Sequence, residues 1–194
     1  MRLTDVTSTM ETILTALPTV PPYRVGGTSA ALLQGVHLPA GDIDVLVARR
    51  ADVDTFAAAL SPFPCLYPAA WLPETAQYFT RHEVNGVVVE ISTVERETDS
   101  DGMECIGRGP WQHCVQVTCG AHRVPVVRLE LRLATELARD RPDRYEPILG
   151  HLAAHGCDAA LLRRALTANG VPVPAALGEL PLEQVFGGLR GLGG

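Results

Sequence analysis

The sequence predicts an α+β fold, in which a body of strands and helices up to about residue 128 precedes a small C-terminal helical subdomain. Three observations predict it. Apolar residues recur at helical spacing near the N-terminus, Asn85-Gly86 separates two strand-like runs, and leucines recur at helical spacing after Arg128. No internal repeat is present, so we expect one body and one helical appendage.

Five elements are expected before residue 61, each bounded by a recognisable signal. Pro18 ends the first helix, and Pro39-Ala40-Gly41 breaks the chain before the second strand. Asp52 favours the start of the last helix, because an acid stabilises a helix N-terminus. The expected elements are a helix at Ser8–Leu17, a strand at Tyr23–Val25, a helix at Ser29–Leu33, a strand at Asp42–Ala48 and a helix at Asp52–Leu60.

The clearest local signal in the next part is Asn85-Gly86, because these residues supply the positive φ angles of a hairpin turn. A second, weaker strand pair is expected around Gly120. We therefore expect an irregular connection at Ser61–Pro73, a hairpin of Tyr78–Val84 and Val87–Thr93, a loop at Thr98–Pro110, and strands at Cys114–Thr118 and His122–Leu129. By position, the predicted domains are residues 1–127, a helical subdomain at 128–170 and a Pro/Gly-rich, partly ordered tail at 171–194.

Composition limits the classes of function. Of the 194 residues 46% are hydrophobic and 20% charged, as in an ordinary globular protein, and the net charge of −6 argues against a general nucleic-acid binder. All 16 basic residues are Arg, so lysine Schiff-base chemistry and a P-loop lysine are excluded. No membrane-spanning run and no secretory signal accompany the five cysteines, so we expect a cytoplasmic location. The oligomeric state is left open.

Asp42 and Asp44 carry the first sign of chemistry. Because they are two apart on the predicted strand, their side chains leave the same face, with Cα atoms roughly 6.5–7 Å apart. Two carboxylates at that spacing repel by about 2–3 kcal/mol at an effective dielectric constant near 20. A solvated strand face would screen this repulsion, whereas in a cleft a proton or a divalent cation must offset it. Oxygen ligands of this kind suit Mg²⁺.

The turn Gly26-Gly27-Thr28-Ser29 is a candidate phosphate site. Glycines let the backbone approach a phosphate closely, a helix N-terminus presents free N–H groups, and the two hydroxyls add donors. A metal-bound triphosphate is a ligand that needs both this turn and the acid pair. The alternative is a plain tight turn.

Glu90 is a candidate third acid. It stands among Val and Ile, where a buried strand would carry an apolar residue. If its strand lies beside Asp42–Ala48, Glu90 could join the aspartates and ligate a metal or accept a proton from an attacking hydroxyl. The alternative is an edge-strand acid that pairs with Arg81 across the hairpin.

These motifs resemble the polymerase-β-type nucleotidyltransferase superfamily, particularly small bacterial members similar to aminoglycoside and lincosamide nucleotidyltransferases. Gly27-Thr28 takes the place of the family's Gly-Ser pair, with thirteen residues between it and Asp42. Gly26-Gly27 leaves fourteen residues before Asp42 and falls outside the family spacing. The resemblance spans roughly residues 23–92. A looser similarity in the C-terminal helices places Arg132 and the cluster of Arg139, Arg141, Asp143 and Arg144 where family members carry basic residues.

The resemblance implies a nucleotidyltransferase-type mixed β-sheet and a Mg²⁺-dependent transfer of a nucleoside monophosphate from an NTP to an acceptor hydroxyl, with release of pyrophosphate. Asp42, Asp44 and Glu90 would be the catalytic and metal-binding residues for two Mg²⁺ ions. Gly26, Gly27, Thr28 and Ser29 would bind the nucleotide. A different class remains open: a catalytically silent or toxin–antitoxin-type module of the same fold that binds nucleotide or a protein partner.

One further set of residues suggests zinc. His113, Cys114, Cys119 and His122 are potential zinc ligands, but their spacing matches no compact zinc finger. On one continuous strand Cys114 and Cys119 point to opposite faces. Buried cysteines that behave as small hydrophobic residues are the preferred interpretation.

Overall fold

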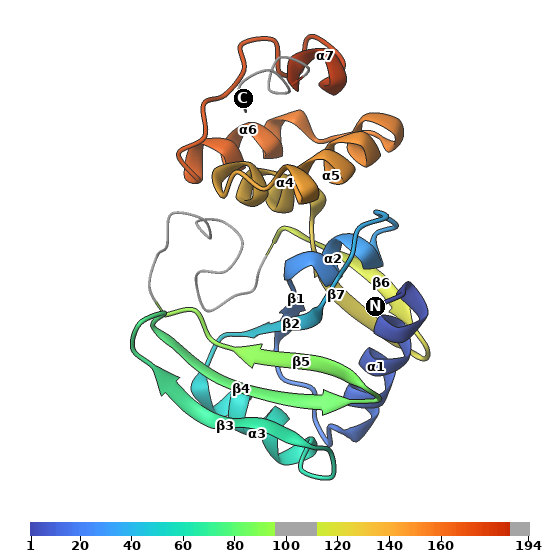
Figure 1. The fold of residues 1–194 in the computed structure, drawn as a ribbon, viewed down its shortest axis with the longest axis vertical. Coiled ribbons are helices and arrows are strands. Elements are labelled where there is room, and N and C mark those ends of the chain that lie inside the picture. Colours follow the sequence, from blue (N-terminus) through green and yellow to red (C-terminus); the bar gives the residue numbers. More distant parts are fainter. Residues whose placement is uncertain (96–111, 187–194) are drawn as a thin grey trace. The chain divides into compact units, whose positions relative to one another are not determined.

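The computed structural model describes residues 1–95 and 112–186, and backbone contacts divide the chain after Arg128 into two compact units. The predicted loop at Thr98–Pro110 lies outside the described residues, as do the last eight residues of the predicted tail. The elements of the first unit (Figure 1) are α1 (Leu3–Ala16), β1 (Tyr23–Val25), α2 (Gly27–Leu33), β2 (Asp42–Val47), α3 (Arg50–Ala59), β3 (Cys65–Leu72), β4 (Gln77–Val84), β5 (Val87–Ser92), β6 (Cys114–Cys119) and β7 (His122–Val127).

In the described part of the first unit, seven strands form one mixed sheet in the order β3-β4-β5-β2-β1-β7-β6. The parallel pairs are β2 with β5 and β1 with β7, and the other neighbours are antiparallel. Strand β2 therefore lies between β5 and β1 in the interior of the sheet. The predicted α+β fold class is confirmed.

One face of the sheet carries the hydrophobic core. Helices α1 and α3 pack against the strands (Figure 1), and their apolar residues join Ile43, Val45, Val89 and Ile91, which are fully buried. Successive side chains of a strand leave opposite faces. Asp42, Asp44 and Glu90, which alternate with these residues, are consequently on the other face, and each is partly exposed.

The first helix begins at Leu3, five residues before the predicted start at Ser8. Its first turn is stabilised by Asp5, whose carboxylate accepts a hydrogen bond of 2.8 Å from the backbone N–H of Arg2. Val6 is fully buried, like Met10 one turn later, and extends the apolar face backwards. The prediction missed this turn because its one apolar core residue, Val6, stands between polar residues.

The Asn85-Gly86 hairpin is confirmed, with φ angles of 55° and 75° at the two turn residues and β4 paired antiparallel to β5. The predicted irregular connection at Ser61–Pro73 is wrong, because it contains β3 (Cys65–Leu72). β3 is an edge strand with irregular register, most of its side chains are exposed, and it carries Pro68, which an edge strand tolerates. Its sequence, CLYPAAWL, shows no alternation of apolar and polar residues, so the strand period of two is not visible in it.

The second unit is helical, as predicted. Its helices are α4 (Leu129–Ala138), α5 (Pro142–His155), α6 (Ala159–Ala168) and the short α7 (Leu182–Phe186), which lies within the predicted tail. α4 contacts both α5 and α6, and Leu133, Leu162 and Leu166 are fully buried. None of the helices in the described ranges has the length and apolar composition to cross a membrane.

Candidate active site

Strand β2 fixes the first two acids of the site. Asp42 and Asp44 leave one face of the strand, while Ile43 and Val45 enter the core with no exposed surface. Burial of these two apolar side chains holds the register of β2, because a shift by one residue would turn both acids into the core. The pattern in the sequence therefore sets the face on which the carboxylates stand.

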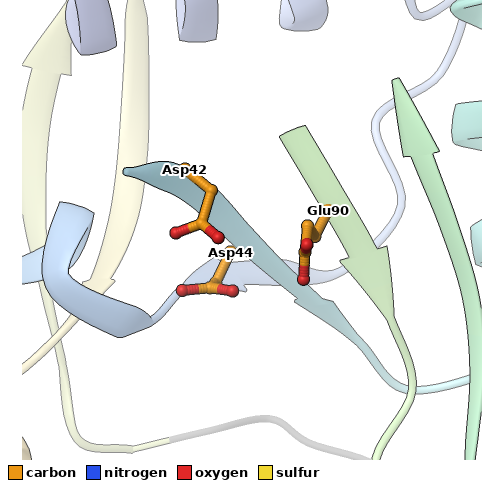
Figure 2. Close-up of side chains that lie close together, drawn as sticks. All are labelled: Asp42, Asp44 and Glu90. Carbon is orange, nitrogen blue, oxygen red and sulfur yellow. The ribbon is translucent and has the colours of Figure 1, made fainter. Parts of the chain in front are cut away.

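The parallel pairing of β2 with β5 brings the third acid alongside, since Asp44 is the register partner of Glu90. Figure 2 shows the three carboxylates gathered from the two strands. One oxygen from each of Asp42, Asp44 and Glu90 lies within 4.8 Å of the others. Among the described residues this is the one group of three or more acidic, His or Cys side chains that is close enough to share a metal ion.

Glu90 also contacts Arg81. Each of the two predictions for this residue, a third acid beside the aspartates and an edge-strand acid paired with Arg81, therefore agrees in part with the structure. Arg81 on β4 is the antiparallel register partner of Glu90, and its Nε donates a hydrogen bond of 2.7 Å to Oε1. The edge-strand part of the alternative is wrong, because β5 lies between β4 and β2. Glu90 thus has a carboxylate on one side and a guanidinium on the other.

The glycine turn lies directly against Asp44. The backbone N–H of Gly26 donates a hydrogen bond of 2.9 Å to the carbonyl oxygen of Asp44, and Gly27 has a φ of 60°. A Cβ atom on residue 27 would fall 1.6 Å from Oδ2 of Asp44. Gly27 therefore meets two requirements at once: a left-handed backbone and space for the Asp44 carboxylate.

The two hydroxyls of the turn differ in what they can reach. Ser29 is fully buried, and its Oγ donates a hydrogen bond of 3.1 Å to the carbonyl oxygen of Gly26. Thr28 is largely buried, with 8% of its surface exposed. Ser29 consequently stabilises the turn from inside. The backbone N–H of Gly26 is also engaged, by the carbonyl of Asp44, so the groups left for a ligand are the backbone N–H groups of Gly27 and Thr28 and the side chain of Thr28.

The donor set fits a hard divalent cation. All three side chains are carboxylates, all are half-buried, and their oxygens converge at distances that one or two ions could bridge. Three like charges so close together are unfavourable without a counter-charge. Arg81 supplies one positive charge next to Glu90, and a Mg²⁺ ion would add two more.

The other candidate residues are placed as follows. His113, Cys114, Cys119 and His122 form no such group of three, and Cys119 is buried. In the second unit Arg132 is buried and pairs with Glu136, whereas Arg141 pairs with Asp143 at the surface.

Sequence reasoning did not find the aromatic neighbours of Arg81. Phe79 lies under its guanidinium, 5.5 Å from the ring centre, and Tyr67 contacts Phe79. Tyr67 was missed because β3 was not predicted.

Comparison with known proteins supports the fold. A scan of protein families and a search of curated proteins found no match. Among solved structures, the chain is similar to a Thermotoga maritima protein that carries the provisional name of nucleotidyltransferase, with a TM-score of 0.51 and 18% identity over 75% of this chain and 91% of that one. A provisionally named nucleotidyltransferase from H. pylori gives a TM-score of 0.47 and 14% identity, over 93% of this chain and 88% of that one. At this identity the first likeness shows a nucleotidyltransferase-type α+β fold and nothing finer.

Proposed function

We propose that the protein is a Mg²⁺-dependent nucleotidyltransferase that moves a nucleoside monophosphate from an NTP to an acceptor hydroxyl and releases pyrophosphate. The observation that carries the proposal is the convergence of Asp42, Asp44 and Glu90 on one sheet face, with the Gly26–Thr28 turn against Asp44. A fold alone does not imply an activity, so the proposal rests on this site. The same proposal includes the resemblance of the sequence motifs to those of aminoglycoside and lincosamide nucleotidyltransferases.

Asp42, Asp44 and Glu90 would hold the metal, two ions being the number that the family resemblance implies. When bound, Mg²⁺ neutralises the charge of the phosphate oxygens and of the leaving pyrophosphate. The protein's own contribution is rigidity. β2 and β5 are interior strands with buried neighbours, so the three carboxylates are fixed in place before any ligand arrives.

The Gly26–Thr28 turn would bind the β- and γ-phosphates. Without a side chain at residue 27, the backbone N–H groups of Gly27 and Thr28 can approach phosphate oxygens closely, while the N–H of Gly26 holds the turn to the carbonyl of Asp44. Ser29 acts indirectly in this proposal, because its buried hydroxyl holds the carbonyl of Gly26 and keeps the turn in shape. Thr28 supplies the hydroxyl nearest to the surface.

Glu90 would take the proton of the acceptor. In the proposed step the acceptor oxygen forms a bond to the α-phosphorus, its proton passes to the Glu90 carboxylate, and the bond between the α-phosphorus and the bridging oxygen of pyrophosphate breaks. The electron pair of that bond leaves with pyrophosphate. Positioning and charge stabilisation account for most of the catalysis in such a transfer.

Pyrophosphate release tests the proposal. Purified protein is incubated with Mg²⁺, each of the four NTPs and a panel of hydroxyl acceptors: aminoglycosides, lincosamides, tRNA and proteins. We expect release with at least one pair of substrates, and a loss on the order of 100-fold or more in Asp42→Asn and Asp44→Asn. Asp54→Asn on α3 is the control, because Asp54 hydrogen-bonds to Tyr78 outside the acid group. No release with any pair, or equal release in all variants, contradicts the proposal.

The second candidate, a catalytically silent module, predicts a different binding experiment. Such a module would bind nucleotide equally well with and without Mg²⁺, whereas the enzyme requires the metal for tight NTP binding. Calorimetry with and without EDTA separates the two. The grouping of three carboxylates favours the enzyme, because their mutual repulsion is unfavourable in a module that binds no metal.

A further inference from the structure

Arg81, Glu90 and Asp44 form one row across three adjacent strands. Arg81 is the register partner of Glu90 between β4 and β5, and Glu90 is the register partner of Asp44 between β5 and β2. The row places a guanidinium next to the acid group, on the same face of the sheet. Its order is cation, carboxylate, carboxylate.

The contact between Arg81 and Glu90 is one-sided. Both Nε and Nη2 of Arg81 donate to the same oxygen, Oε1 of Glu90, with the Nε bond at 2.7 Å. Two donors from a rigid guanidinium on one oxygen fix the rotation of the carboxylate and engage Oε1. Oε2 is then the oxygen left for a metal ion or an acceptor proton.

The guanidinium is itself held in place. It lies over the Phe79 ring, 5.5 Å from the ring centre, and Phe79 is two residues before Arg81 on β4. Phe79 is largely buried and contacts the Tyr67 ring at 5.7 Å. An Arg packed on an aromatic face beside a carboxylate gains a cation–π contact and keeps one orientation.

The charge of Arg81 acts on the whole acid group. The three carboxylates carry a formal charge of −3, and Arg81, in direct contact with one of them, offsets one of these charges. Arg81 and a divalent cation therefore compete for the same negatively charged carboxylates. Removing the guanidinium must raise the attraction of the acids for a cation while it releases the carboxylate of Glu90.

We propose that Arg81 is a positioning residue of this site: it orients Glu90 for the reaction and, as a resident counter-ion, weakens the binding of the divalent cation. The inference rests on the proposed function. It predicts that removal of the Arg81 guanidinium has two effects of opposite sign: tighter binding of the cation and lower activity. A residue with a merely structural role would lower metal affinity and activity together.

The experiment measures Mn²⁺ binding and turnover in the full chain. For Arg81→Met we expect Mn²⁺ to bind more tightly by a factor on the order of 3 to 10, since one unit charge next to the site is lost. The rise in melting temperature on adding Mn²⁺ should also be larger than in the unmutated protein. With a productive acceptor, kcat should fall by roughly 10-fold or more, while the KM for NTP changes little.

Two further variants sharpen the test. Arg81→Lys keeps the charge but loses the two-donor geometry, so its Mn²⁺ affinity should return to that of the unmutated protein while kcat stays low. Arg50→Met is the matched control. Arg50 also pairs with a Glu, lies 4.3 Å over the ring of Trp71 and has 50% of its side chain exposed, against 44% for Arg81. Its removal should leave Mn²⁺ affinity unchanged.

The outcomes separate the two proposals. If the unmutated protein binds no Mn²⁺, or if Asp42→Asn and Asp44→Asn bind it equally well, the metal site of the proposed function fails. If the unmutated protein binds Mn²⁺ at these acids and Arg81→Met binds it no more tightly, the counter-ion role of Arg81 is overturned and the proposed function stands. An unchanged kcat in Arg81→Met overturns the orienting role.

Discussion

Gly27 and Asp44 lie so close together that a Cβ atom at residue 27 would stand 1.6 Å from Oδ2 of the aspartate. The two residues are separated by a helix and a loop in the chain, yet they share one small space at the start of α2. The candidate phosphate turn and the candidate metal ligand are therefore a single structural unit. A change in the turn must displace the acid.

Gly27→Ala is expected to be more costly than an ordinary substitution at a glycine with positive φ. Adopting the left-handed region costs a non-glycine residue about 1–2 kcal/mol, and the collision with Asp44 adds roughly 1–3 kcal/mol. Urea denaturation gives the loss of stability, and Mn²⁺ titration should show weaker binding because the Asp44 carboxylate is displaced.

Gly86→Ala is the control for that measurement. Gly86 has a φ of 75°, but no atom lies within 4 Å of a Cβ placed there. The Gly86→Ala variant should therefore lose only about 1–2 kcal/mol of its free energy of unfolding, and its Mn²⁺ binding should be unchanged. Equal losses of stability and equal metal binding in the two variants would contradict the close contact between residue 27 and Asp44.

Ser29→Ala should affect stability and leave nucleotide binding almost unchanged. The variant loses the buried hydrogen bond from Ser29 to the carbonyl of Gly26, worth about 1 kcal/mol. That carbonyl still accepts a hydrogen bond from the backbone N–H of Ala30, so it is not left unsatisfied. Thermal denaturation and NTP titration measure the two effects. A tenfold or greater loss of NTP affinity in a folded variant would instead mean that Ser29 contacts the phosphates directly.

His82 should make the stability of the protein depend on pH below about 6.5. It is buried on β4, and burial lowers the pKa of its imidazole below the ordinary value of 6.5. Thr80 donates its one hydroxyl proton to the carbonyl of Tyr67, so it must accept from Nε2–H of His82, which identifies the neutral tautomer.

The sign of the effect follows from the lowered pKa. The unfolded chain binds a proton at His82 near pH 6.5, whereas the folded chain resists it, so the contribution is fully present above pH 6.5 and is lost as the pH falls toward the folded pKa. Between pH 7 and 5.5 the loss of stability from this group is at most about 1 kcal/mol, the limit for a folded chain that binds no proton there. His82→Gln keeps a donor for Thr80 but does not titrate, and urea denaturation should show a smaller loss over this range. The same loss in both proteins would contradict the assignment.

Glu136→Gln in the second unit should be strongly destabilising. Glu136 has no exposed surface and pairs with Arg132, which is also buried. Removing one charge of a buried pair costs about 3–5 kcal/mol, because the buried guanidinium of Arg132 then loses the negative charge that Glu136 supplies. Asp143→Asn is the control, since its ion pair with Arg141 is exposed to solvent and is expected to contribute little to stability. Denaturation midpoints that fall equally in both variants would contradict this difference.

The sequence by itself determined the local features of this protein. The alternation of acids with Ile43 and Val45 placed both carboxylates of β2 on one face, because side chains alternate with a period of two on any strand. Asn85-Gly86 determined a hairpin, because its φ angles suit one type of turn. The α+β class followed from the same short-range periodicities.

Only the tertiary structure decided which strands are neighbours. Asp44 and Glu90 are register partners although the chain between them includes a helix and two further strands. Side-chain alternation carries no information about such a parallel pairing. The place of Glu90 beside the aspartates could therefore be predicted only on the condition that the two strands are neighbours. The same holds for β3, whose sequence shows no alternation of apolar and polar residues, and so for Tyr67. The sequence placed Arg81 opposite Glu90, but only the position of β5 between β4 and β2 shows that one glutamate meets a guanidinium and an aspartate together.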